Sequence, residues 1–291
     1  MYRCRQDLHL HIGGDSLENL LKNVKKSGIK TLSIIDKESV DRITEIEGAC
    51  KKHDLNCLRG VEVNARYANN IYHFLVYNFK NIQKVRGFFK KEAKAKYRRA
   101  MKVVARLQKL GWRVNFDSLN NIPRQFLGRR LVVENVRNHP ENQERLLKEE
   151  IFGNDDFYRR YLEPGKPAYC ARKVSSVYQL LKTMRAAGAL IIWAHPWRSI
   201  HENFGQSNFK ENFLATFNAF LKVGVDGVEV YYPDVPKETI IFMYRLCRKN
   251  HMLVSIGSDS VGSDLTPLPA IIKGMEPDSI ISATSLYRGV L

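Results

Sequence analysis

The sequence predicts an α/β fold built around parallel strands, with a separate helical segment in its middle. Short apolar runs alternate with stretches of helical periodicity near both ends of the chain, which is the order expected of β-α-β units. The middle of the chain lacks this rhythm and is strongly basic. With 291 residues, of which 44% are hydrophobic, the chain is long enough to bury a full-sized core.

The first third of the chain alternates between predicted strands and helices. Residues 16–27 carry four aliphatic side chains at helical spacing and are followed by Gly28, the expected C-terminal cap. The other predicted elements of this part are a helix at 40–53 and strands at 5–11, 31–35, 58–63 and 71–79.

The same alternation returns in the last third. The predicted helices are 174–187, 209–223 and 237–250, and the predicted strands are 189–194, 227–231 and 253–256. We therefore predict that residues 1–79 and 174–291 form one α/β domain, and that residues 80–173 form a mainly helical lobe inserted into it.

The predicted lobe begins with a long basic helix at residues 80–110. Between Phe79 and Lys148 there are 19 Lys and Arg residues against 5 Asp and Glu, so this segment carries +14 of the net charge of +17. A localised basic surface captures polyanions such as RNA. A solvated helix face without a partner is the alternative interpretation.

Other bulk features exclude several classes of protein. No apolar run approaches the roughly 20 residues of a membrane span, and the first residues do not resemble a signal peptide. The five cysteines are scattered and form no CxxC pair, which argues against a disulfide framework or a cysteine zinc site. We expect a cytoplasmic protein that does not bind membranes, and no protein partner is indicated.

Six metal-capable side chains lie on the predicted strands or directly after them. They are His9, His11, Glu62, His73, His195 and Asp259. In a parallel barrel the carboxyl ends of the strands meet at one mouth, so we expect these groups to converge there. A lone histidine on a strand is usually structural, and only the whole constellation indicates a site. Imidazoles together with carboxylates suit zinc, manganese or iron(II).

The motifs containing these residues, DLHLH, IIDKES, GVEVNA, YHFLVY, AHPWR and GSDSVG, resemble in order and spacing those of the PHP (polymerase and histidinol phosphatase) superfamily. The segments KYRRAMKVVARLQKLGW, GRRL and FYRRYLEPGKPAY resemble the insertion of one bacterial branch, the nucleoside 3′,5′-bisphosphate phosphatases and 5′-to-3′ exoribonucleases. The resemblance implies a distorted (β/α)7 barrel with up to three metal ions.

The sequence departs from the family pattern at four positions. Ser16 replaces an aspartate, while Lys37, Val261 and Leu131 replace histidines. In the family, the first three positions serve mainly one of the three metals, so the resemblance implies one or two ions here. His9, His11, Glu62 and Asp259 would hold one ion, and Glu62, His73 and His195 a second. Lys37 would partly replace the charge of the missing ion, although decay of the enzyme is the alternative.

The resemblance also implies residue roles. Glu62, Asp259, Lys37 and Arg129 are the predicted catalytic residues, and Arg98, Arg99, Arg129 and Arg198 are predicted to bind substrate. Asp7 and Asp36 are predicted to orient metal ligands, and Tyr231 and Tyr232 either stack bases or pack in the core.

The sequence thus predicts a phosphoesterase that hydrolyses nucleotides or RNA ends through a hydroxide activated by manganese, zinc or iron. Two alternatives remain open. One is a catalytically impaired module that binds nucleic acid or a protein partner, and the other is a small-metabolite phosphatase.

Overall fold

The computed structural model describes residues 5–122, 127–171, 173–205 and 208–280. The chain divides into two compact units: unit 1 comprises residues 1–86 and 175–291, and unit 2 comprises residues 87–174. Within the described ranges, no helix combines the length and the apolar character that crossing a membrane requires.

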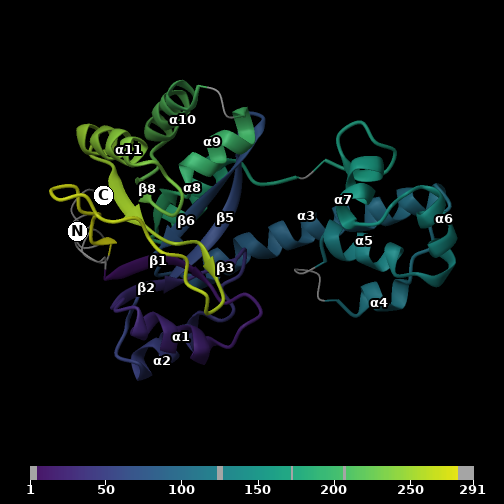
Figure 1. Ribbon diagram of the computed structural model, residues 1–291, viewed down its shortest axis with the longest axis horizontal. Coiled ribbons are helices and arrows are strands. Elements are labelled where there is room, and N and C mark those ends of the chain that lie inside the picture. Colours follow the sequence, from purple (N-terminus) through teal and green to yellow (C-terminus); the bar gives the residue numbers. More distant parts are fainter. Residues whose placement is uncertain (1–4, 123–126, 172, 206–207, 281–291) are drawn as a thin grey trace. The chain divides into compact units, whose positions relative to one another are not determined.

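Unit 1 contains two sheets and the helices that pack on them (Figure 1). The first sheet has the strand order β10-β1-β2-β4, and the second has the order β3-β5-β6-β7-β8-β9. The strands are β1 (Gln6–His11), β2 (Thr31–Ile34), β3 (Asp36–Lys37), β4 (Asn56–Cys57), β5 (Gly60–Tyr67), β6 (Asn70–Tyr77), β7 (Leu190–Trp193), β8 (Gly227–Tyr231), β9 (Leu253–Ile256) and β10 (Ser260–Val261). The helices are α1 (Leu17–Lys26), α2 (Ile43–Lys52), α8 (Val177–Arg185), α9 (Pro196–Phe204), α10 (Phe209–Val223) and α11 (Lys237–Lys249).

The α/β class is confirmed, and most strand pairs are parallel as expected, but β6 is an exception. Strand β6 runs antiparallel to both of its neighbours, β5 and β7. Only residues 68–69 separate β5 from β6, whereas a parallel crossover needs a dozen residues or more. The two strands therefore form a hairpin. Among the described residues the strands make two sheets, and no single closed sheet is formed.

Local sequence explains the elements that the chain forms. The side chain of Ser16 accepts a hydrogen bond from the backbone N–H of Asn19 and thereby caps α1. The chain leaves this helix through Gly28, whose φ of 83° is readily adopted only by glycine. Strand β7 is buried along its whole length, and its Trp193 stacks on Phe213 of α10. The helices thus cover the apolar face of the second sheet.

Unit 2 is helical and has its own core. Its helices are α4 (Phe116–Asn120), α5 (Arg129–Arg137), α6 (Gln143–Lys148), α7 (Asn154–Phe157) and the C-terminal part of α3 (Ile82–Lys109). Trp112, Phe157 and Tyr161 pack edge-to-face or tilted in the centre of this core. The guanidinium group of Arg145 lies 4.1 Å from the centroid of the Trp112 ring.

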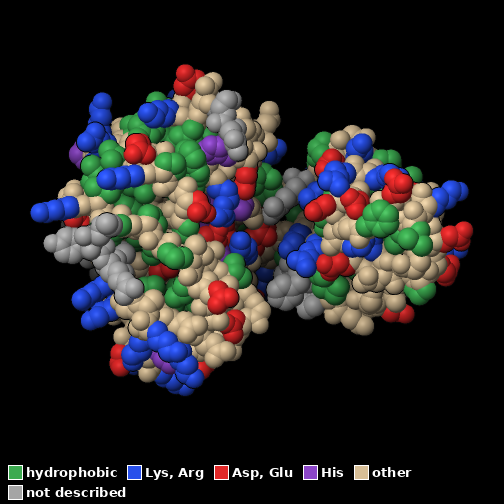
Figure 2. Space-filling view, viewed as in Figure 1, with side chains coloured by type: hydrophobic (Ala, Val, Ile, Leu, Met, Phe, Trp, Pro, Cys, Tyr) green, Lys and Arg blue, Asp and Glu red, His purple; other side chains and the backbone are tan. Residues whose placement is uncertain are grey.

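The positive charge of unit 2 is partly neutralised within the unit. Acidic and basic side chains lie side by side on its visible face (Figure 2). Three of its ion pairs are Arg113–Glu141, Arg130–Glu134 and Arg145–Glu149. Of these arginines, Arg113 and Arg130 are exposed, whereas Arg145 is partly buried against Trp112.

The described cysteines form no disulfide. Cys50, Cys57, Cys170 and Cys247 are free thiols, and Cys4 lies outside the described residues.

Candidate metal centre

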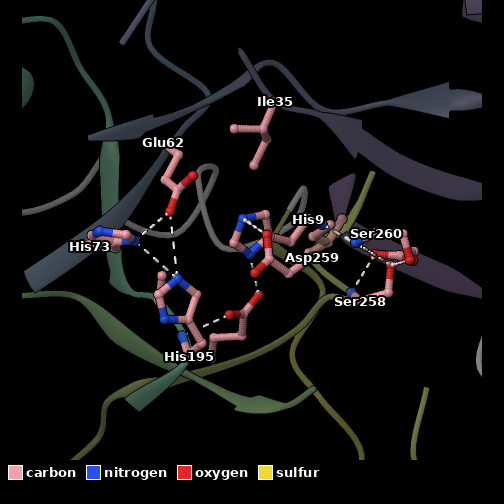
Figure 3. Close-up of polar contacts among 12 residues, drawn as sticks. His9, Ile35, Glu62, His73, His195, Ser258, Asp259 and Ser260 are labelled. Carbon is pink, nitrogen blue, oxygen red and sulfur yellow. Dashed lines mark hydrogen bonds and ion pairs between the residues drawn. The ribbon is translucent and has the colours of Figure 1, made fainter. Parts of the chain in front are cut away.

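Two groups of metal-capable side chains come together in unit 1. His9, His11 and Glu62 form the first group, and Glu62, His73 and His195 form the second. In each group the potential ligand atoms lie within 4.8 Å of one another. Glu62 belongs to both groups and points toward His73 and His195 (Figure 3).

Strand geometry explains most of this convergence. His9 and His11 are two residues apart on β1, so their side chains project from the same face. His73 on β6 pairs with Asn64 on β5, two residues beyond Glu62, and this register places Glu62 and His73 on one face of the hairpin. His73 Nδ1 lies 2.8 Å from Glu62 Oε1. Glu62 and His73 lie within their strands, as the sequence predicts, whereas His195 and Asp259 lie beyond the ends of theirs.

His195 and Asp259 occupy strained turns directly after strands. His195 follows β7 with a φ of 30°, and Asp259 follows β9 with a φ of 52°. Non-glycine residues in this left-handed region cost about 1–3 kcal/mol each, and they cluster at functional sites. Such strain persists only where surrounding contacts enforce it. Here the backbone N–H of His195 donates to Glu229 Oε2 at 2.8 Å.

The first group concentrates lone pairs at one point. His9 Nδ1 lies 3.0 Å from Glu229 Oε1, and His11 Nδ1 lies 2.6 Å from the carbonyl oxygen of Ile35. Because both acceptors take an N–H from Nδ1, Nε2 is the ring nitrogen that each histidine presents to the centre. The two Nε2 atoms are 3.2 Å apart, and Asp259 Oδ1 lies 3.0 Å from Nε2 of His11. Each Nε2 offers a lone pair to a cation when the ring carries only its Nδ1 proton, so the two imidazoles and the carboxylate form a donor set that fits a metal ion.

The second group is less supported by other residues. His195 Nε2 lies 3.2 Å from His73 Nδ1 and 3.5 Å from Glu62 Oε1. The buried Nδ1 of His195 and the buried Oε2 of Glu62 have no hydrogen-bond partner within the described ranges. Buried polar atoms are normally satisfied, and this carboxylate oxygen has ion-pair contacts with Lys37 and His11 in place of hydrogen bonds, so its surroundings suit a cation. The Nζ of Lys37 lies 3.3 Å from Glu62 Oε2.

The electrostatics of the site favour positive charge. Burial alone would raise the pKa of Glu62, but hydrogen bonds to His195 and His73 hold it well below its usual range. Burial alone would lower the pKa of His9, but the charge and hydrogen bond of Glu229 raise it to about 9. Asp259 likewise has a lowered pKa, because the hydrogen bond to His11 and nearby imidazoles outweigh its burial. The carboxylates are therefore ionised and attract a cation.

Glu229 is a site residue that the sequence analysis missed. Its fully buried carboxylate contacts the His9 ring through one oxygen and the His195 backbone through the other. The signal was available, because Glu229 interrupts the apolar run GVEVY just as Glu62 interrupts GVEV. Gly257 makes room for the pair, since a Cβ there would lie 2.3 Å from His9 Cβ and 2.6 Å from Glu229 Oε1.

Asp7 and Asp36, the two residues predicted to orient metal ligands, make different contacts. Asp7 Oδ1 accepts hydrogen bonds from the backbone N–H groups of His9 and Ser258, at 3.2 and 2.9 Å. It therefore ties the segment before Asp259 to strand β1. Asp36 pairs through its backbone with Val61 on β5 and is partly buried.

The predicted substrate-binding arginines fall into both units. Arg198 lies in unit 1, where its guanidinium group donates to Asp259. Arg98 is exposed on α3 in unit 2. Arg99 donates to the carbonyl of Cys170 at 2.8 Å, and Arg129 lies over the ring of Tyr158. Arg99 and Arg129 thus make contacts within unit 2 itself.

The substituted positions have other local contacts. Ser16 caps α1, and the neighbouring Asp15 accepts a hydrogen bond from the backbone N–H of Ser263 at 3.0 Å. Val261 is 59% exposed on β10, and Leu131 packs against the core of unit 2. None of these side chains belongs to the two described ligand groups.

Two solved structures share this fold. An amidohydrolase from Chromobacterium violaceum, with bound sulfate and no metal, superposes with a TM-score of 0.70 at 18% identity and covers 97% of this chain and 96% of its own. A protein from Bifidobacterium adolescentis, assigned as a metal-dependent phosphoesterase, gives a TM-score of 0.67 at 19% identity, covering 98% and 96%. At this level of identity, the likeness establishes the fold.

Sequence comparison adds one relative. A 5′-3′ exoribonuclease of Haemophilus influenzae is 24% identical over 261 residues, which cover 88% of this chain and 89% of the relative. No family profile matches the chain.

Proposed function

We propose that this protein is a metal-dependent phosphoesterase of the PHP type, which hydrolyses phosphate esters of nucleotides or of RNA ends. The arrangement of His9, His11 and Asp259, with lone pairs and a carboxylate directed at one point, carries the proposal. The resemblance to an exoribonuclease along most of both chains supports the substrate class. Under this proposal the two sheets are an opened form of the distorted seven-stranded barrel, and residues 80–173 are the inserted lobe.

One or two divalent metal ions are part of the proposal, with manganese, zinc and iron as the candidates. His9, His11, Glu62 and Asp259 would hold one ion, and Glu62, His73 and His195 the other. Divalent ions supply two things when bound, a lowered pKa of water and neutralisation of charge on phosphate oxygens. Glu229 and Asp7 act on the ligands rather than on the substrate.

The cationic side chains of the site bind the phosphate. Arg198 shares its guanidinium group with Asp259 and has further N–H donors, which form a planar fork suited to phosphate oxygens. Lys37, whose side chain is 59% exposed, places an ammonium group beside Glu62 and adds fixed positive charge. Arg98, Arg99 and Arg129 of unit 2 contribute charge that attracts a polyanionic substrate, and Arg129 is proposed to act in catalysis.

A non-catalytic binding module is the second candidate. Val261 exposes an apolar side chain and Ser16 caps a helix, where the family pattern has metal ligands. These replacements favour a protein that keeps the fold and binds nucleic acid without turnover.

Phosphate release tests the two candidates. Purified protein is incubated with manganese and either a 3′,5′-bisphosphonucleotide or a short 5′-phosphorylated RNA, beside the His9→Ala/Glu62→Ala double variant. Turnover that disappears in the double variant supports the phosphoesterase. Folded, metal-loaded protein without turnover, but with salt-sensitive RNA binding, supports the binding module.

A further inference from the structure

A cavity of about 550 Å³ opens beside the candidate metal centre. It is lined by residues 197, 198, 201 and 202 of α9 and by residues 232–234, which follow β8. Two of these residues also contact proposed metal ligands. Arg198 pairs with Asp259, and the ring of Tyr232 lies 6.3 Å from that of His195. A group held in the cavity is therefore close to Asp259 and His195, both of which are labelled in Figure 3.

The wall of this cavity includes an aromatic surface held in place. The Trp197 ring lies 4.2 Å from that of His201 and 4.6 Å from that of Phe209, measured between centroids. Trp197 is only partly buried, whereas Trp112 and Trp193 are buried completely. Trp197 is therefore held by two neighbouring rings while part of its side chain stays accessible at the cavity.

Tyr232 forms a buried part of the same wall. Its hydroxyl accepts a hydrogen bond from the backbone N–H of Arg198 at 2.7 Å. This bond ties the start of α9 to the end of β8. Tyr231 and Tyr232 are both buried, so packing rather than an open stacking face describes them.

The charges of the cavity discriminate between ligands. Glu202 and Asp234 line it with exposed carboxylates, which repel a phosphate group. Carboxylates accept hydrogen bonds from exocyclic amino groups, such as those of adenine and cytosine. Arg198, which is paired with Asp259, supplies the positive charge. The cavity therefore suits a flat aromatic group with N–H donors, attached to a phosphate held at the metal centre.

We propose that this cavity is a nucleobase subsite, in which the base stacks on Trp197 and donates hydrogen bonds to Glu202 or Asp234. The inference rests on the proposed function and refines it, because it selects nucleotides among phosphate esters. The cavity volume lies within the roughly 300–1,000 Å³ of small-molecule sites. Uracil has no exocyclic amino group and presents two carbonyl oxygens instead, so uridine nucleotides bind most weakly.

Tryptophan fluorescence and calorimetry test this subsite. Protein with added manganese is titrated with adenosine, cytidine and uridine 5′-monophosphates. The adenosine and cytidine nucleotides quench the fluorescence, because Trp197 is the accessible tryptophan. Trp197→Leu loses this quenching, and its calorimetric affinity for the adenosine nucleotide falls roughly 10-fold. Trp197→Phe retains an aromatic face and most of the affinity. Tyr178→Leu, at a 59% exposed aromatic residue on α8, binds like the wild type.

Two results would overturn the proposal. Unchanged affinity in Trp197→Leu removes the stacking role, and equal affinity for uridine and adenosine nucleotides removes the role of the carboxylates. No phosphate release is read in this titration. The subsite therefore stands or falls independently of turnover, so its failure is distinct from failure of the phosphoesterase proposal.

Discussion

The two ligand groups of the metal centre differ in how the protein holds their histidines. In the first group, His9 and His11 each have a second partner on the ring nitrogen that faces away from the centre. In the second group, the corresponding atom of His195 has none among the described residues, and the side chain of His73 is 34% exposed. Outer partners fix the orientation and tautomer of metal-binding histidines. The first group is therefore preorganised, whereas the second depends on the ion to order it.

Glu62→Gln is expected to have the largest effect, because Glu62 is the residue common to both groups. Turnover falls by about 1,000-fold or more, which corresponds to about 4 kcal/mol of transition-state stabilisation. We expect calorimetry to show weaker manganese binding at both ligand groups. Glu45→Gln, at an exposed carboxylate on α2, serves as the control and leaves both quantities unchanged. If the variant lost manganese binding at only one of the two groups, Glu62 would not be a ligand common to both.

Glu229→Gln tests the preorganisation of the first group. The glutamine amide is neutral, and only its oxygen can accept a hydrogen bond. It therefore cannot accept from both the His9 ring and the His195 backbone N–H, as the Glu229 carboxylate does. Substitutions of such outer partners lower metal affinity by about 10- to 100-fold. Manganese calorimetry on the folded variant measures this loss. Wild-type affinity would show that the first group does not need its carboxylate support.

A pair of alanine variants compares the groups without any metal. His9→Ala leaves the buried Glu229 carboxylate without its imidazole, and we expect a loss of about 2–3 kcal/mol in the free energy of unfolding. His73→Ala removes a partly exposed ring, and Glu62 keeps its contacts with His195 and Lys37, so we expect a loss of about 1 kcal/mol or less. Denaturant unfolding in chelator measures both values. Equal losses of unfolding free energy in the two variants would contradict the conclusion that His9 is held more firmly than His73.

Lys37→Gln is expected to have the smallest effect on stability. An exposed ion pair contributes about 0–1 kcal/mol, and the Lys37 side chain is 59% exposed. Without the competing ammonium group, Glu62 binds manganese more tightly, while turnover falls because fixed positive charge is lost. Calorimetry and phosphate release together test this opposite response. Weaker manganese binding in the variant would count against Lys37 as a substitute for an ion.

The sequence predicts local features of this fold better than long-range ones. The capped helix α1 and the buried strand β7 follow from residue type and spacing alone. The direction of β6 depends on its partners, and only the short connection at residues 68–69 indicates a hairpin. Whether the sheets close depends on contacts between strands that are far apart in the chain.

The candidate site shows the same limit. The ligand constellation could be predicted because its residues belong to an ordered series of motifs. Glu229 could not be assigned by that route, since its role is visible only when β8 is placed beside His9 and His195. The resemblance groups the arginines of unit 2 together, and the structure separates those with partners in the unit, such as Arg99, from the exposed Arg98.

The sharp turn at His195 has a consequence for how this chain can evolve. Helix α9 starts at Pro196, so a proposed metal ligand and the α9 side of the cavity wall are encoded within the eight consecutive residues 195–202. Point changes at residues 197–202 can alter which substrate is accepted while the preceding turn stays intact. An inserted residue before Pro196 would instead displace ligand and cavity wall together. Recognition is thus free to diverge by substitution, whereas the length of this segment is constrained.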